Sequence, residues 1–287
     1  MKRLFALLLM LLLICTRAAA APLSIYASVP PVAAIAAAVG GTYIQVHSLL
    51  RPGDNPVTFS PTPLQLAHLA DSRLFLSVGV PFEHAWLPRI RAAAPALQVL
   101  DVRSGLALEP LPEHHHPGAD AHSDEEEADP HVWNDPLAVV HMSKTIRDAL
   151  IQADPTHAEA YRRQQAALAD RLRALDTELR TTLAPYRGRS FLVFHPAWGY
   201  FARRYELQQL AIEHQGKQSG ARWMKELIDR ARREDIHVIV VQPQFDQRMA
   251  GQIAQAISGR VASVDPLSAD YQDSLRRLAR IIAGGGA

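Results

Sequence analysis

Short apolar runs and amphipathic stretches alternate along most of this chain. From Leu23 onward, buried strands are indicated by the runs LSIYAS, YIQVHSLL, RLFLSVG and LQVLDV, which helix-like segments separate. The same alternation resumes later with SFLVFH, LQQLAIE, IHVIVVQP and RVASVDP. A chain in which strands and helices alternate in this way forms parallel sheets with helices on both faces. The predicted fold class is therefore α/β, with two parallel-sheet units.

A helical region separates these two units. From about Thr156 to Tyr186, leucines recur at spacings of three and four residues and so share one helix face: Leu168, Leu172, Leu175, Leu179 and Leu183. A helix of roughly 30 residues is about 45 Å long, enough to link two lobes. We expect an N-terminal lobe over residues 22–136, a helical region with one long rigid linker helix over 137–187, and a C-terminal lobe over 188–287. A cleft would lie between the lobes.

The N-terminus has the pattern of a secretory signal peptide. Lys2 and Arg3 precede an apolar run, and small residues that suit cleavage follow near Ala19 to Ala21. The run is shorter than the roughly 20 residues of a membrane-spanning helix. It contains the single cysteine, Cys15. We therefore expect residues 1–21 to be a cleaved signal peptide and the mature protein to be periplasmic and free of thiols.

Composition narrows the classes of function. Lys and Arg total 30 and Asp and Glu total 29, so the formal net charge is +1 and a nucleic-acid partner is not indicated. The chain is 48% hydrophobic, which is too apolar for global disorder. Without a thiol, any metal site of the mature chain must use His, Asp or Glu.

Histidines and carboxylates crowd together in the stretch EHHHPGADAHSDEEEADPHVWNDP, residues 113 to 136. Its Pro, Gly, Ser and acidic content predicts a mobile loop over residues 113–130, because these residues have little to bury. Four histidines of this loop are candidate auxiliary metal ligands: His114, His115, His116 and His122. The alternative is a solvated linker whose histidines bind nothing.

Three further residues are candidate ligands because of their places along the chain. His195 ends SFLVFH, Asp265 ends RVASVD, and His131 lies between the two α/β units. Ligands of open α/β sheets bind beyond the carboxyl ends of the strands. Two imidazoles and one carboxylate suit Zn²⁺. Each residue also has a structural interpretation. His195 and Asp265 could be turn residues, and His131 could pack against Trp133.

Four stretches carry a resemblance to a known family. In order along the chain they are DPHVWNDP, FLVFHPAWGYFARRY, IEHQGKQS and VQPQF…VASVDPL. They resemble the ZnuA-like family of zinc/manganese periplasmic solute-binding proteins of ABC transporters, over essentially the whole mature chain. The resemblance implies two α/β lobes on a rigid linker helix and a metal cleft with the ligands His131, His195 and Asp265. It also implies a membrane permease as partner and no enzymatic activity; histidine at position 195 favours Zn²⁺ over Mn²⁺. We expect a monomer.

One position departs from the family pattern. The family's first ligand is a histidine in a segment resembling PGADPHTFEPTP, whereas this chain reads RPGDNPVTFSPTP and has Val57 there. Three interpretations remain open: three protein ligands with water or chloride in the fourth position, a fourth ligand from the 113–130 loop, or loss of high affinity. His84, in an expected helix, is a further substitute.

Three functions follow from these alternatives. The first is capture of Zn²⁺ and delivery to an ABC-transporter permease. The second is a periplasmic zinc buffer or chaperone that works through the His-rich loop with a weakened cleft site. The third is a secreted zinc hydrolase, since catalytic zinc also has three protein ligands and an open position. However, the sequence has no His-Glu-x-x-His pattern, and Gln242 offers no general base.

Overall fold

The computed structural model describes residues 21–110, 128–214, 217–218, 220–245 and 247–284. The expected signal peptide, apart from Ala21, and the histidines of the 113–130 loop therefore lie outside the described residues. None of the helices in the described ranges is both long and apolar enough to cross a membrane.

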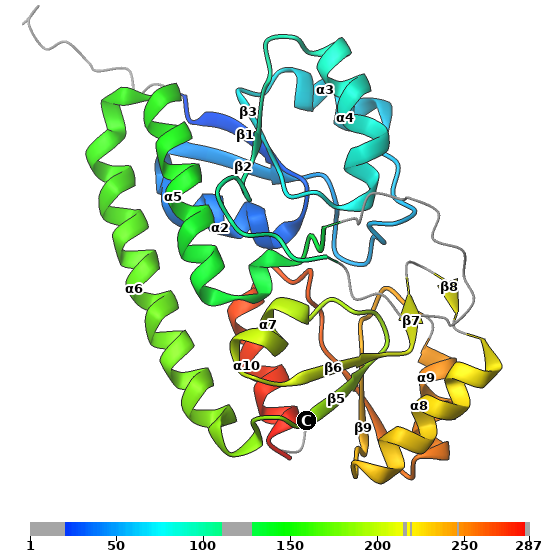
Figure 1. The fold of residues 1–287 in the computed structure, drawn as a ribbon. Coiled ribbons are helices and arrows are strands. Elements are labelled where there is room, and N and C mark those ends of the chain that lie inside the picture. Colours follow the sequence, from blue (N-terminus) through cyan, green and yellow to red (C-terminus); the bar gives the residue numbers. More distant parts are fainter. Residues whose placement is uncertain (1–20, 111–127, 215–216, 219, 246, 285–287) are drawn as a thin grey trace, which may run out of the picture.

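The N-terminal lobe is built on a parallel four-stranded sheet (Figure 1). Its strands, in the order β2-β1-β3-β4 across the sheet, are β1 (Leu23–Ala27), β2 (Ile44–Ser48), β3 (Leu74–Ser77) and β4 (Gln98–Asp101). The helices between them are α2 (Pro30–Gly40), α3 (Pro63–Ala70) and α4 (Pro81–Ala93). Each of these helices begins with proline, whose fixed φ suits the first helical turn and whose missing N–H is not needed there.

The linker consists of two packed helices, α5 (Pro136–Ala153) and α6 (Ala158–Leu183). The five leucines predicted to share a face are all buried: Leu168, Leu172, Leu175, Leu179 and Leu183. Helix α6 has 26 residues, and single 3-10 turns flank it at residues 155–157 and 184–186. It therefore spans about 39 Å at 1.5 Å per residue. Helix α5 packs alongside it, so the linker is a helix pair (Figure 1).

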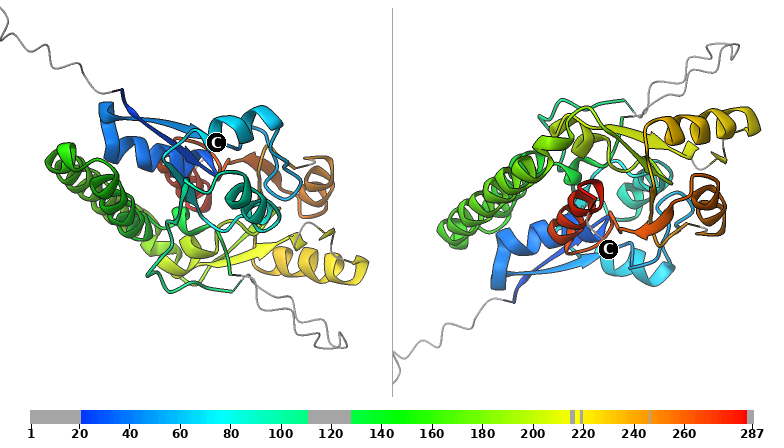
Figure 2. Two further views of the ribbon diagram at one scale, coloured as in Figure 1. Left: turned by 90° about the horizontal axis from the view of Figure 1, so that it is seen from above. Right: turned by 90° about the horizontal axis from the view of Figure 1, so that it is seen from below.

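The C-terminal lobe contains a second parallel four-stranded sheet, in the order β10-β9-β5-β6. Its strands are β5 (Ser190–Val193), β6 (Gln208–Ala211), β9 (Val238–Val241) and β10 (Arg260–Ser263). Its helices are α7 (Gly199–Arg204), α8 (Ala221–Arg233), α9 (Gln247–Ala256) and α10 (Tyr271–Ile282). A short antiparallel hairpin, β7 (Glu213–His214) and β8 (Lys217–Gln218), follows β6. Figure 2 shows the two lobes along the helical linker from above and below.

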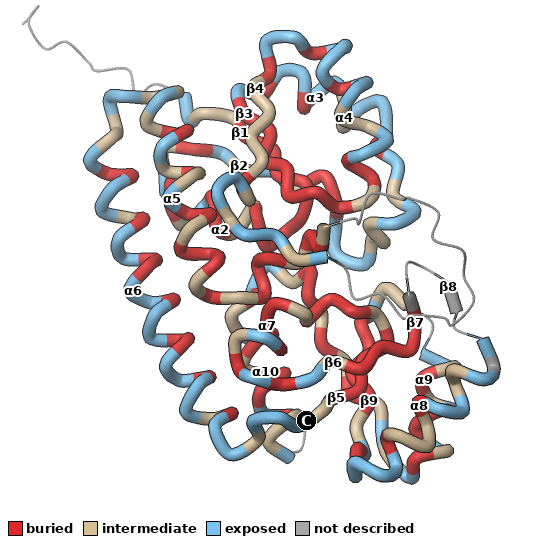
Figure 3. The backbone as a smooth tube through the Cα atoms, in the orientation of Figure 1, coloured by how far each residue is buried: buried red, intermediate tan, exposed pale blue. Residues whose placement is uncertain are grey.

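One hydrophobic core runs through both lobes and the linker. It joins Ile25 and Leu76 of the first sheet to Leu172 of α6 and to Val193 and Val240 of the second sheet. A smaller core, which includes Leu192 and Ile239, lies between the second sheet and helices α8 and α9. The buried backbone in Figure 3 follows this path from lobe to lobe. The predicted architecture is confirmed: two α/β lobes joined by a linker that contains one long helix.

Candidate metal centre

His131 lies on the segment that leads from the N-terminal lobe into α5, directly before a 3-10 turn at Val132–Asn134. The Asp129 carboxylate fixes it twice, because Oδ1 accepts from the His131 backbone N–H at 2.9 Å and lies 2.7 Å from Nδ1 of the ring. Asp129 is 2% exposed. A carboxylate can only accept hydrogen bonds, so this contact favours a proton on Nδ1 of the ring.

His195 follows β5, at the carboxyl end of the second sheet. Its backbone N–H donates to Oε1 of Gln242 at 3.3 Å, and Nε2 of Gln242 donates to the His195 carbonyl at 2.8 Å. The imidazole stacks on Phe245, with 5.0 Å between ring centroids and 18° between planes. Its Nδ1 lies 3.4 Å from Oε1 of the buried Glu213. These contacts hold the ring from the backbone, from one face and from one nitrogen.

The structure brings His131 and His195 together. Their ring centroids are 5.4 Å apart and the planes are inclined by 71°. Burial lowers the pKa of His195, and the nearby His131 acts in the same direction, while the hydrogen bond to Glu213 opposes both. The neutral imidazole is the form that binds metals. The lowered pKa of His195 therefore favours the form that binds metals, and the imidazole of His131 lies beside it.

Asp265 follows β10 at the carboxyl end of the same sheet. Its Oδ1 accepts from Nε2 of Gln244 and from the backbone N–H of Leu267, each at 2.9 Å. The segment that carries Asp265 contacts the segment that carries His131: the indole N–H of Trp133 donates to the Pro266 carbonyl at 2.8 Å. In the part of the chain that the structure describes, no group of three or more His, Cys, Asp or Glu side chains already has the arrangement of a metal site. The three-ligand set thus remains a prediction.

The other candidate positions are less constrained. Val57 lies on a turn between β2 and α3, is 43% exposed, and donates its N–H to Oδ1 of Asn55 at 2.9 Å. His84 is exposed on α4, the helix expected from the sequence. The four auxiliary candidates, His114, His115, His116 and His122, lie outside the described residues.

Sequence reasoning did not identify the partners of the two histidines. Asp129 falls within the expected mobile loop, yet it is buried and bonded to His131. Glu213 belongs to a hairpin too short for periodicity to reveal. One signal was available, since ligating histidines usually donate their second N–H to a carboxylate or carbonyl. The Asp-x-His spacing of residues 129 to 131 fits that rule.

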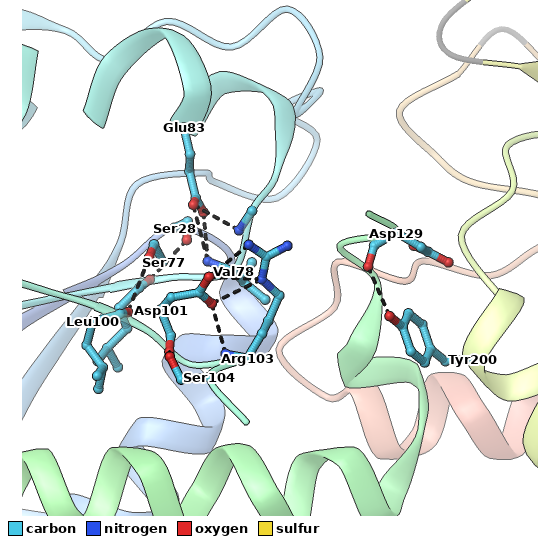
Figure 4. A network of polar contacts seen from close by, with 12 residues as sticks. Ser28, Ser77, Val78, Glu83, Leu100, Asp101, Arg103, Ser104, Asp129 and Tyr200 are labelled. Carbon is cyan, nitrogen blue, oxygen red and sulfur yellow. Dashed lines mark hydrogen bonds and ion pairs between the residues drawn. The ribbon is translucent and has the colours of Figure 1, made fainter. Parts of the chain in front are cut away.

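A separate polar network lies at the carboxyl ends of the first sheet (Figure 4). The Glu83 carboxylate is 1% exposed and accepts from the backbone N–H groups of Val78 at 3.0 Å and Gly79 at 2.9 Å. Next to it, Arg103 pairs with Asp101 at 2.8 Å. Burial raises the pKa of Glu83. Backbone donors satisfy this carboxylate, so we assign it a structural role at the end of the sheet.

Comparison with known proteins gives a consistent result. The sequence profile of one family, "ZnuA: Zinc-uptake complex component A periplasmic", matches residues 25–285. A crystal structure of ZnuA is 32% identical, with a TM-score of 0.84, and the match covers 93% of this chain and 100% of that one. A ZnuA deletion mutant with zinc bound is equally similar, at 32% identity, a TM-score of 0.84 and coverage of 93% and 98%. The "Iron-binding protein YfeA" of Yersinia pestis is 28% identical over 246 residues, which are 82% of this chain and 75% of that protein.

Proposed function

Because the chain belongs to the family of periplasmic zinc-uptake complex components A, we propose that it captures Zn²⁺ in the periplasm and delivers it to the membrane permease of an ABC transporter. Zn²⁺ is the cargo, and the protein performs no catalysis. The match to a zinc-bound ZnuA structure supports zinc as that cargo. The apolar run at residues 4–15 supports export through a signal peptide cleaved near Ala19 to Ala21.

The observation that carries this proposal is the pair of adjacent, partly buried imidazoles. His131 and His195 approach within 5.4 Å between ring centroids, and each directs its Nδ1 toward a carboxylate. Nε2 of each ring is then the nitrogen that binds the cargo. Asp265 completes the proposed set of three, because its segment is bonded to the His131 segment through Trp133 and Pro266.

We propose that the fourth position is open in this protein. Valine cannot ligate, and exposed Val57 stands where the family has its first histidine. Zinc sites with three protein ligands and an exchangeable water are common. Such a site retains zinc less firmly than a closed one, which suits a protein that must release its cargo. Occupation of this position by a histidine of the 113–130 loop is the alternative that experiment must separate.

The other two functions are less well supported. A zinc buffer working through the loop does not need the pair formed by His131 and His195. A hydrolase needs a general base beside the metal, and the Gln242 amide bonds to the His195 backbone through both its oxygen and its nitrogen. Neither alternative accounts for a family match that extends over both lobes.

Competition with a chromophoric chelator tests the proposal. We expect the chain from residue 22 to bind one Zn²⁺ tightly, and the same chain without residues 113–128 to bind it nearly as well. Replacing His131 or His195 with alanine should weaken binding by more than about 100-fold, since loss of an outer partner alone costs about 10- to 100-fold. The matched control is His237→Ala, which removes a histidine with a 54% exposed side chain.

Two results would contradict this assignment. Full affinity in His195→Ala would remove the cleft from consideration. Several weak sites that disappear with residues 113–128 would support the buffer instead.

A further inference from the structure

Each of the two proposed histidine ligands faces a buried carboxylate through the nitrogen that does not bind the cargo. Asp129 lies 2.7 Å from Nδ1 of His131, and Glu213 lies 3.4 Å from Nδ1 of His195. These carboxylates are 2% and 4% exposed. We propose that Asp129 and Glu213 are positioning residues that keep the proton of each imidazole on Nδ1 and thereby select Nε2 for the cargo. This inference rests on the proposed zinc-binding function.

Asp129 fixes both the position and the tautomer of His131. The same oxygen, Oδ1, accepts from the backbone N–H of His131 at 2.9 Å and faces the ring nitrogen. A carboxylate has no proton to donate to the ring. The neutral ring must therefore carry its proton on Nδ1, and the lone pair lies on Nε2 before any metal arrives. The negative charge also increases the basicity of Nε2 as a ligand.

The C-terminal lobe holds Asp129 in place. The Tyr200 hydroxyl of α7 donates to the Asp129 carbonyl at 3.3 Å and accepts from the backbone N–H of Glu109 at 3.1 Å. Figure 4 shows Tyr200 directed at Asp129. A Cβ at Gly199 would lie 2.9 Å from Oδ2 of Asp129, closer than side chains normally approach. A larger residue at the start of α7 would therefore displace the Asp129 carboxylate or the helix.

The contact between Asp129 and Gly199 places both histidines against the same short segment, residues 195–199. His195 and Gly199 are four positions apart, and Nδ2 of Asn134 donates to the carbonyl of Ala197 between them at 2.8 Å. The segment that carries His131 is thus bonded to the segment that carries His195. We infer that the distance between the two imidazoles is set before zinc binds.

Glu213 acts more weakly on His195. Its 3.4 Å separation from Nδ1 is at the long end of hydrogen-bond distances. The ring of His195 is also held by the stacked Phe245 and by its own backbone bonds to Gln242. Loss of the Glu213 charge should therefore cost less affinity than loss of the Asp129 charge.

The first test is Asp129→Asn. The amide oxygen can still accept from the His131 backbone, but the charge is lost and the amide nitrogen can present a donor to the ring. We expect zinc affinity to fall by about 10-fold or more, and Glu213→Gln to cause a smaller loss. The matched control is Asp235→Asn, which changes another Asp-x-His pair, bonded at 2.8 Å but exposed at its ends. Asp235 has a φ of 55°, which asparagine tolerates well, so zinc affinity should not change.

Gly199→Ala tests the contact with Asp129 without changing a polar group. The added Cβ would lie 2.9 Å from Oδ2 of Asp129, so the carboxylate or the helix must shift and zinc affinity should fall. Zinc affinity equal to that of the wild type in Gly199→Ala would overturn the proposal.

A readout without metal keeps this inference distinct from the proposed function. Nitrogen-15 NMR of the imidazoles in the metal-free protein should show Nδ1 protonated on His131 and His195, and Asp129→Asn should alter the signals of His131. If the wild type shows this pattern but binds no zinc, the proposed function fails and the tautomer assignment stands. If His131 carries its proton on Nε2, or if Asp129→Asn binds zinc like the wild type, the positioning role is overturned.

Discussion

At the scale of single residues, Val57 is the position at which the proposed site departs from the family pattern. It is 43% exposed on a turn, and its backbone N–H donates to Oδ1 of Asn55 at 2.9 Å. A histidine at this position meets no packing constraint from a buried neighbourhood. The position is thus free to accept the ligand that the family pattern places there.

We expect Val57→His to strengthen zinc binding by about tenfold or more, equivalent to about 1.4 kcal/mol. The reason is that a fourth protein ligand closes the open position of the site. Chelator competition measures the gain, and Val57→Ala serves as the control that changes the side chain without adding a ligand. An unchanged affinity in Val57→His, together with a gain once residues 113–128 are deleted, would mean that the loop already fills this position.

Glu83 gives a prediction for the pH dependence of stability. Burial raises its pKa, against the opposing effects of the hydrogen bonds from Ser28, Val78 and Gly79 and the charge of Arg103. A carboxyl group whose pKa is raised in the folded state stabilises the fold below its unfolded pKa, and this contribution is lost as pH rises through the folded value. Relative to wild type, Glu83→Gln should therefore become progressively more stable as pH rises from about 4 to 8.

Urea unfolding at several pH values measures this difference. The difference between the free energies of unfolding of wild type and Glu83→Gln excludes the contributions of all other carboxylates, because these are present in both proteins. Glu226→Gln, on the exposed face of α8, is the control and should track the wild type throughout. A constant difference between wild type and Glu83→Gln across this range would show that Glu83 keeps the same protonation state in the folded and unfolded protein.

At the scale of elements, the 3-10 turn at Val132–Asn134 joins three parts of the molecule. Trp133 is fully buried and donates to the Pro266 carbonyl at 2.8 Å, which ties the turn to the segment that carries Asp265. Asn134 ties the same turn to Ala197. A three-residue turn thus connects the segments of all three proposed ligands.

Trp133→Phe should lower both stability and zinc affinity. It leaves the Pro266 carbonyl without its indole donor, which costs about 1–3 kcal/mol for a buried group, and it releases the Asp265 segment. Denaturant unfolding and chelator competition measure the two effects. Trp86→Phe on α4 is the matched control, because Trp86 is only partly buried and packs beside Arg89. Unchanged zinc affinity in Trp133→Phe would show that this bond does not position Asp265.

Sequence patterns predict the long helices and the strands of the sheets but not the shortest elements. The strands of both sheets could be predicted from short continuous apolar runs, and the leucine face of α6 from its 3.6-residue period, because both patterns reflect burial. Helix α7 begins only at Gly199, because residues 195–198 form the turn that holds His195. The β7–β8 hairpin has only two residues in each strand, too few for any pattern.

The candidate site shows the same limit. Its ligands could be proposed from the resemblance and from their places after strands. The pairing of His195 with Glu213 could not, because the contact depends on how the hairpin folds back onto β5. That arrangement is set by tertiary packing and leaves no periodic trace in the sequence.

At the scale of the whole molecule, the core determines how far the lobes can move. The larger hydrophobic cluster includes Ile25 of the first sheet, Leu172 of α6 and Val240 of the second sheet. A wide hinge motion would expose part of this shared core, at about 25 cal/mol for each Å² of apolar surface. Polar contacts add to the cost, because Arg204 of α7 bonds Asp135 at 2.5 Å and also lies 3.6 Å from Asp176 of α6.

We therefore expect zinc binding to proceed without large lobe closure. Small-angle X-ray scattering of the metal-free and zinc-loaded protein should give radii of gyration that agree within about 0.5 Å, close to the roughly 18 Å expected of a compact chain of this size. Arg204→Ala removes the contacts of α7 with Asp135 and Asp176 and should make the metal-free protein more expanded, while zinc restores the compact profile. A wild-type protein that contracts by several ångströms on binding zinc would mean that the shared core opens in the metal-free state and that the helix pair is not a rigid linker.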